Sequence, residues 1–181
     1  MITLAKWSVD DYHAMITAGI VSDRPVELLA GEIIEMSPEG PLHSYTLTEG
    51  VKYLRSLLGD KAEVREAHPI TLSDSEPEPD ITIIKSPNSR YKTHHPYPED
   101  IYWLIEIANT TLTRDLTLKQ SIYAKNNIRE YWVVDLVKTE ITVFTQPRND
   151  SYQQQQTYKQ GTILPLAFPE LEISVSRILQ Q

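Results

Sequence analysis

Two acidic residues lie inside apolar runs of the sequence. Asp80 begins the run 80–84, DITII, and Glu106 stands within the run 102–108, YWLIEIA. A charge inside a strand-like apolar segment is costly unless it is paired or binds a cation. The two runs therefore predict neighbouring strands whose carboxylates hold a hard divalent cation, for which oxygen ligands are preferred. For Asp80, beside Pro79, an exposed or capping acid at a strand edge is the alternative.

A helical face follows the second acid. Asp115, Lys119 and Tyr123 are spaced by four residues within a predicted helix at 113–126, and side chains at this spacing lie on one side of a helix. Lys119 could then stabilise charge on a phosphate or help to deprotonate a metal-bound water. The alternatives are structural: a pair between Lys119 and Asp115, a first-turn acid stabilised by the helix dipole, and a core aromatic at Tyr123.

Three further features could contribute to a site. His43 follows the helix-breaking segment 37–41 (SPEGP) and lies at the start of a predicted helix, where it could bind phosphate or act as a base. A purely structural histidine is the alternative. Glu27 could be a third metal-site acid or an exposed hairpin residue. Arg90 and Lys92, with Tyr91 able to stack on a base, form a basic run that suits nucleic acid, with a solvated loop as the alternative.

The bulk composition limits the class of protein. We expect one domain over 1–181, because the length suits a single core and apolar residues make up 40% of the chain. The absence of cysteine excludes thiol catalysis and cysteine-ligated metal sites, and it fits a cytoplasmic location. No apolar run is long enough to predict a membrane span. The net charge of −8 disfavours a general nucleic-acid binder unless a basic patch or bound metal contributes.

The periodicity predicts a mixed α/β (α+β) sheet flanked by helices. A parallel step is expected from the strand that carries Glu106, through helix 113–126, to a strand at 130–135. The remaining predicted elements are helices 9–18 and 43–58, an N-terminal hairpin of 26–29 and 32–36, strands 62–66, 68–72 and 80–84, a loop at 86–100, a C-terminal hairpin of 140–146 and 151–159, and a short strand in 171–175.

Several ordered segments together resemble the Uma2 family, a group of restriction-endonuclease-like proteins common in cyanobacteria. The resemblance rests on 27–38 (ELLAGEIIEMSP), His43, Pro79-Asp80, 104–108 (LIEIA), Asp115, Lys119, Tyr123 and 130–135 (EYWVVD). It implies a PD-(D/E)XK nuclease core that uses Mg²⁺ or Mn²⁺.

The resemblance also implies roles for residues. Asp80 matches the first motif acid and Glu106 the second, and the Ile107 carbonyl would be a third metal ligand. Ala108 stands where many such nucleases carry lysine, and Lys119 on the next helix takes that place. Glu27 and His43 match recurrent positions near the site. The segment after Glu106 departs from the pattern. Many members carry Ser-Pro there, whereas this chain has 108–111 (ANTT) and its segment is one residue shorter.

Three hypotheses follow from the sequence. The first is a metal-dependent endonuclease that hydrolyses DNA, with a homodimer implied by the resemblance. The second is a nuclease-fold binding or assembly module that holds metal without turnover. The third is a structural domain whose acids are merely paired, which predicts no stabilisation by metal.

Overall fold

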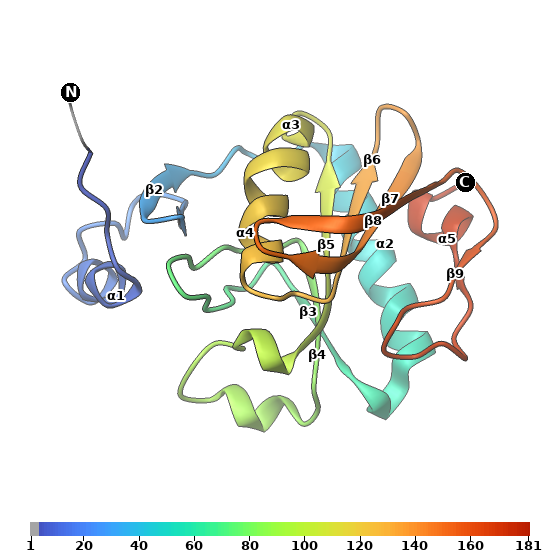
Figure 1. The fold of residues 1–181 in the computed structure, drawn as a ribbon, viewed down its shortest axis with the longest axis horizontal. Helices are drawn as coiled ribbons and strands as arrows, with labels where there is room; N and C mark the ends of the chain where they lie inside the picture. Colours follow the sequence, from blue (N-terminus) through green and yellow to red (C-terminus); the bar gives the residue numbers. More distant parts are fainter. Residues whose placement is uncertain (1–3) are drawn as a thin grey trace.

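A computed structural model describes residues 4–181 of the chain. Its centre is a six-stranded sheet in the order β3-β4-β5-β6-β7-β8 (Figure 1). The strands are β3 (Glu63–Glu66), β4 (Ile81–Ile84), β5 (Ile101–Ala108), β6 (Glu130–Asp135), β7 (Glu140–Arg148) and β8 (Ser151–Tyr158). The pair β5–β6 is parallel and the other neighbours are antiparallel, so the predicted mixed sheet and its parallel step are confirmed.

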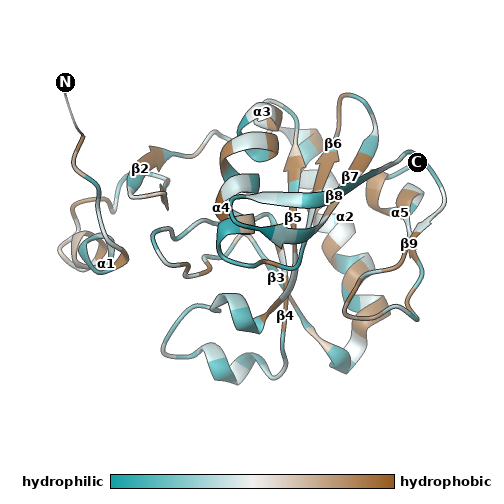
Figure 2. Cartoon of the chain, viewed as in Figure 1, coloured by the Kyte–Doolittle hydropathy of each residue, from teal (hydrophilic) through white to brown (hydrophobic). Residues whose placement is uncertain are grey.

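Helices cover both faces of this sheet. The long helix α2 (Pro41–Leu58) and the short α5 (Val175–Leu179) pack on one face, and α4 (Gln120–Lys125) packs on the other. Alternate residues of β5 divide between the two layers, because side chains of a strand alternate in direction. Trp103 and Ile105 join the α2 layer, whereas Leu104 and Ala108 join the α4 layer. Figure 2 shows β5 and β6 as largely hydrophobic and β8 as hydrophilic.

The N-terminal segment, with α1 and β2, lies at one end of the molecule (Figure 1). The helix α1 (Val9–Thr17) begins with a capping box between Ser8 and Asp11. The predicted hairpin is present as β1 (Val26–Leu29) and β2 (Glu32–Glu35), joined by a turn in which Ala30 and Gly31 both have positive φ. A bridge between Leu28 and Glu76 connects β1 to the loop before β4.

The predicted strand at 68–72 is wrong. Ile70 and Leu72 are buried, but their backbone amides donate to carbonyls of Pro77 and Ser75 rather than to a strand. Their alternation therefore reflects a loop with inward-facing side chains. The loop 86–100 contains two short 3₁₀ turns, η2 (Asn88–Tyr91) and η3 (Pro98–Asp100), and a third, η1 (Gly59–Lys61), follows α2.

Two further predictions are corrected in detail. The helix expected at 113–126 is divided into α3 (Leu112–Arg114), a π-helical turn η4 (Asp115–Lys119) and α4. The strand expected in 171–175 is reduced to β10 (Ile173–Ser174), which pairs with β9 (Thr162–Ile163) and leads directly into α5. No helix among the described residues has the length and apolarity that crossing a bilayer requires.

Candidate functional site

An acidic cavity of about 520 Å³ opens where β4 and β5 meet the start of α2 and the turn η4. Six carboxylates line it, together with the cations Lys119 and Arg114 and the imidazole of His43. The six acids are Glu27, Glu39, Glu78, Asp80, Glu106 and Asp115. Six of the seven acids, bases and aromatic groups predicted for the core of the site line this cavity. The seventh, Tyr123, is fully buried and donates to Glu106.

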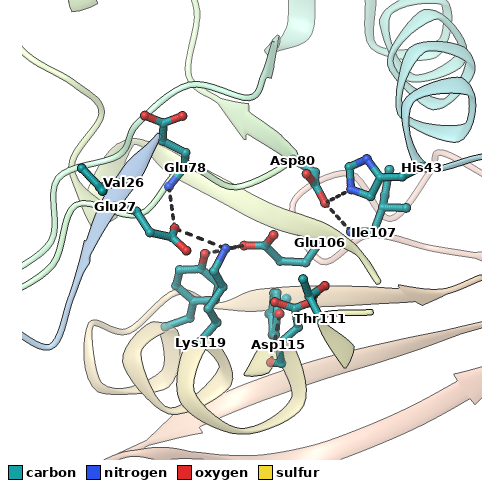
Figure 3. Close-up of polar contacts among 12 residues, drawn as sticks. Val26, Glu27, His43, Glu78, Asp80, Glu106, Ile107, Thr111, Asp115 and Lys119 are labelled. Atoms are coloured by element: carbon teal, nitrogen blue, oxygen red, sulfur yellow. Dashed lines mark hydrogen bonds and ion pairs between the residues drawn. The ribbon is translucent and has the colours of Figure 1, made fainter. Parts of the chain in front are cut away.

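Asp80 joins three elements at the mouth of the cavity (Figure 3). Its Oδ2 accepts a hydrogen bond from the backbone N–H of Ile107 at 2.6 Å and contacts Nε2 of His43 at 3.1 Å. The other nitrogen of His43, Nδ1, lies 3.7 Å from Glu39. Burial disfavours a charge on His43, but Asp80 and Glu39 outweigh it and raise the pKa of the imidazole. Asp80 is thus fixed between α2 and β5.

Glu106 is buried on the neighbouring strand, beside Lys119 (Figure 3). Lys119 and Tyr123 hold its carboxylate. Its Oε1 accepts hydrogen bonds from Lys119 Nζ at 3.0 Å and from the Tyr123 hydroxyl at 2.7 Å. Glu27 lies 3.4 Å from the same ammonium group, so the lysine stands between two acids that are 1% and 3% exposed.

Burial sets the protonation of this cluster. It raises the pKa of Glu106, with Lys119 opposing the shift. Burial disfavours the charged lysine as well, but Glu106 and Glu27 outweigh it and raise the pKa of Lys119. The cluster therefore keeps its lysine charged and tolerates a proton on one acid.

The π-helical turn η4 presents Asp115 and Lys119 to the cavity. π-helical turns are rare and occur frequently at functional sites. Asp115 accepts a hydrogen bond from Thr111 Oγ1 at 2.6 Å, and burial raises the pKa of its carboxyl group. The ion pairs of Lys119 are made with Glu27 and Glu106. The alternative of a simple pair between Lys119 and Asp115 along one helix is therefore not the arrangement found.

Sequence reasoning missed two acids of the cavity, Glu39 and Glu78. The backbone N–H of Glu78 donates to Glu27 Oε2 at 3.2 Å, and burial raises the pKa of Glu78. Glu78 stands two residues before Asp80 in the segment PEPD, a spacing that puts side chains of an extended chain on one side. Glu39 stands four residues before His43. These two spacings were the available signals.

The two basic residues predicted to bind nucleic acid lie outside the acidic cavity. Arg90 lies in η2 and forms an ion pair with Asp100 at 3.2 Å. Lys92 is exposed and lines a different cavity, on the β3 side of the sheet. A role for either residue in binding nucleic acid stays a prediction.

The donor set suits a hard divalent cation. Within residues 4–181, the buried atoms Glu27 Oε1 and His43 Nδ1 have no hydrogen-bond partner. Ligand atoms of Glu39, His43 and Asp80 lie within 4.8 Å of one another, close enough to share one ion. Carboxylate-rich surroundings favour Mg²⁺ or Mn²⁺ over softer metals. The residues present therefore fit a divalent metal, while Glu106 and the Ile107 carbonyl as ligands stay predictions, because Glu106 is not part of this group.

Comparison with known proteins identifies the family. The family model Uma2, described as "Putative restriction endonuclease", matches residues 9–176. The chain belongs to the Uma2 family. This confirms the family suggested by the sequence. A search of curated proteins found no match.

A solved structure supports the fold of this Uma2 protein. A protein from Anabaena variabilis, titled a putative nuclease belonging to DUF820, superposes with a TM-score of 0.66. The two chains are 20% identical, and the match covers 86% of this chain and 89% of the other. At this identity the likeness establishes the nuclease-like fold, and activity has to be argued from the site.

Proposed function

We propose that this Uma2 protein is a metal-dependent endonuclease that hydrolyses DNA phosphodiester bonds. The observation that carries the proposal is the pairing of buried Glu106 with Lys119 beside Asp80, on adjacent strands that open into one acidic cavity. Asp80 and Glu106 would hold Mg²⁺ or Mn²⁺. A divalent cation bound there supplies Lewis-acid polarisation of the phosphate and a water of lowered pKa.

The other side chains of the site hold these two acids in place. His43 and the Ile107 N–H both contact Oδ2 of Asp80 and so fix this carboxylate. Lys119 and Tyr123 likewise fix Oε1 of Glu106. Preorganised charge at a buried site costs no reorganisation during reaction, so a charged Lys119 can also stabilise negative charge that develops on a bound phosphate.

The charge of the cavity supports a requirement for metal. The cavity contains six carboxylates and two cations, Lys119 and Arg114, and Lys119 already forms ion pairs with two of the acids. A phosphodiester entering this cavity meets net negative charge, which repels it. Positive charge supplied by a divalent cation removes this repulsion, so we expect DNA to enter the cavity together with metal.

Cleavage assays test the proposal. Supercoiled, linear and single-stranded DNA are incubated with Mg²⁺ or Mn²⁺, the wild-type protein, Glu106→Gln, and the control Glu172→Gln, which changes an exposed acid outside the cavity. We expect metal-dependent cutting by the wild type and the control, and loss of cutting and of metal binding in Glu106→Gln with the fold retained. Wild-type cutting rates in Glu106→Gln would refute the assignment of this acid.

A binding or assembly module without turnover is the second candidate. The net charge of −8 favours it, as does the fact that Lys119 neutralises Glu106 within the chain itself. It predicts thermal stabilisation by Mn²⁺ in a protein that cuts none of the three DNA forms. A domain with purely structural acid pairs predicts neither effect. The expected homodimer is tested separately by light scattering coupled to size exclusion.

A further inference from the structure

A second cavity, of about 770 Å³, lies on the β3 edge of the sheet, between that strand and the 3₁₀ turn η2. Its lining includes four basic side chains, Arg55, Arg65, His68 and Lys92. The two acids that also line it, Glu63 and Glu66, belong to β3. The cavity therefore differs in character from the acidic one, in which carboxylates outnumber cations.

Arg65 is the side chain in this cavity whose contacts are incomplete. It is half-buried, and its Nη1 is buried with no hydrogen-bond partner among residues 4–181. Burial lowers the pKa of the guanidinium, with Tyr91 opposing the shift. A buried donor without a partner is costly, so such a group in a folded protein calls for a ligand, an ion or a water.

Two of the neighbouring charged groups have partners of their own. Arg55 donates to the carbonyl of Val64 at 3.0 Å, and Glu63 accepts the backbone N–H of Asn88 at 3.1 Å. Lys92 is exposed at the rim of the cavity. The cavity therefore offers the guanidinium of Arg65 with the ammonium of Lys92 among its lining residues, a combination that matches the oxygens of a phosphate.

The two cavities are adjacent. Glu66 and His68 line the basic cavity, and Ala67, between them in the chain, lines the acidic one. The backbone N–H of Ala67 donates to the carbonyl of Asp80 at 3.0 Å, which ties this segment to the first acid of the site. Consecutive residues of one segment therefore line both cavities, which favours a single bound strand of nucleic acid that contacts both.

We propose that Arg65, with Lys92, binds a backbone phosphate of DNA beside the cleavage site. This inference rests on the proposed function, because it assigns the substrate's flanking phosphate to a site of its own. It also accounts for how a chain with a net charge of −8 can hold an anionic substrate, since contacts with phosphates supply most of the affinity of such proteins.

Binding measurements test the site without relying on cleavage. Anisotropy of labelled duplex DNA is measured over a range of salt, with Ca²⁺ in place of Mg²⁺, for the wild type, Arg65→Gln and the control Arg148→Gln. Arg148 is exposed in the β7–β8 hairpin and lines neither cavity. We expect Arg65→Gln to bind about tenfold more weakly, with a salt dependence reduced by about one phosphate contact. The control should match the wild type.

A second measurement separates DNA from free anions. Thermal unfolding is followed in inorganic phosphate and in chloride of equal ionic strength, and phosphate should stabilise the wild type but not Arg65→Gln. Loss of the phosphate effect with unchanged DNA binding would mean a site for free anions and would overturn the DNA assignment. Equal behaviour of Arg65→Gln and the wild type in both measurements would overturn the site itself.

The nuclease proposal and the phosphate site can fail separately. DNA binding that depends on Arg65 in a protein that cuts no DNA would support the site and refute the nuclease. Normal cutting by the wild type, with DNA binding that does not change in Arg65→Gln, would support the nuclease and refute the phosphate site. If Arg65→Gln does not fold, Lys92→Gln takes its place, because Lys92 is exposed and its change leaves the interior intact.

Discussion

Lys119→Met is the substitution that tests the buried charge cluster most directly. Lys119 is 4% exposed and contacts Glu106 at 3.0 Å and Glu27 at 3.4 Å. Methionine keeps a long, flexible apolar chain and removes the charge, so two buried acids lose their cation. We expect the variant to fold at neutral pH with a markedly lower free energy of unfolding, and to lose DNA cleavage.

The expected size follows from the distances and the burial. At an effective dielectric constant of about 20, each contact of Lys119 contributes about 5 kcal/mol of attraction, part of which is offset by desolvation of the lysine. In the variant a buried acid can lose its charge by binding a proton. Protonating one acid of ordinary pKa 4.5 at pH 7 costs about 3.4 kcal/mol. The net loss should be about 3–5 kcal/mol, the range for breaking a buried pair.

The sign of the pH dependence follows from the same reasoning. Burial raises the pKa of Glu106 and Lys119 opposes that shift, so without Lys119 the folded-state pKa of Glu106 lies further above the unfolded value. The variant is then most stable when Glu106 is protonated, and that stability is lost as the pH rises through the raised pKa. At pH 5 the cost of protonation falls to about 0.7 kcal/mol per acid, and the difference from wild type should shrink accordingly.

Urea unfolding at pH 7 and at pH 5 measures both effects. Lys125→Met is the matched control, because Lys125 is exposed and its pair with Asp74 should contribute little. Mn²⁺ should stabilise Lys119→Met more than wild type, since the metal replaces the missing positive charge. A loss below about 1 kcal/mol at pH 7, or a loss that grows at pH 5, would refute this account of the cluster.

Two further substitutions test neighbouring features. Tyr123→Phe removes the hydroxyl that donates to Glu106 at 2.7 Å, and urea unfolding should show a loss of about 1–3 kcal/mol; no loss would mean that this hydrogen bond is dispensable. Burial raises the pKa of Glu130, so its contribution to stability is full below about pH 4.5 and declines as the pH rises through the raised value. Thermal unfolding should therefore depend less on pH in Glu130→Gln, and an unchanged profile would contradict the assignment.

The central strands and the acids on them could be predicted because each carries a local signal. Asp80 and Glu106 are charges in apolar runs, and pairing of β4 with β5 brings the two runs together. The four-residue spacing of Lys119 and Tyr123 predicted that they share one helical face, and in the structure both donate to Glu106. In these cases the sequence pattern and the tertiary contact agree.

The remaining parts depend on contacts between distant segments, for which the sequence carries little signal. Ile70 and Leu72 alternate as in a strand, yet their partners are loop carbonyls. The sequence of η4 indicates only a helix and carries no signal for its π-helical form. Glu39 and Glu78 looked like ordinary loop acids because the walls of the cavity come from four separate regions of the chain.

The position of Glu27 has a consequence for how the molecule folds. Glu27 belongs to the small sheet of β1 and β2, whereas Lys119 belongs to the turn after β5, so their contact closes a very long loop in the chain. Contacts between such distant segments form after local ones, because loop closure costs entropy. We expect the hairpin to dock last and to open first under mild denaturant, so that amide hydrogen exchange would be faster in 26–35 than in β5.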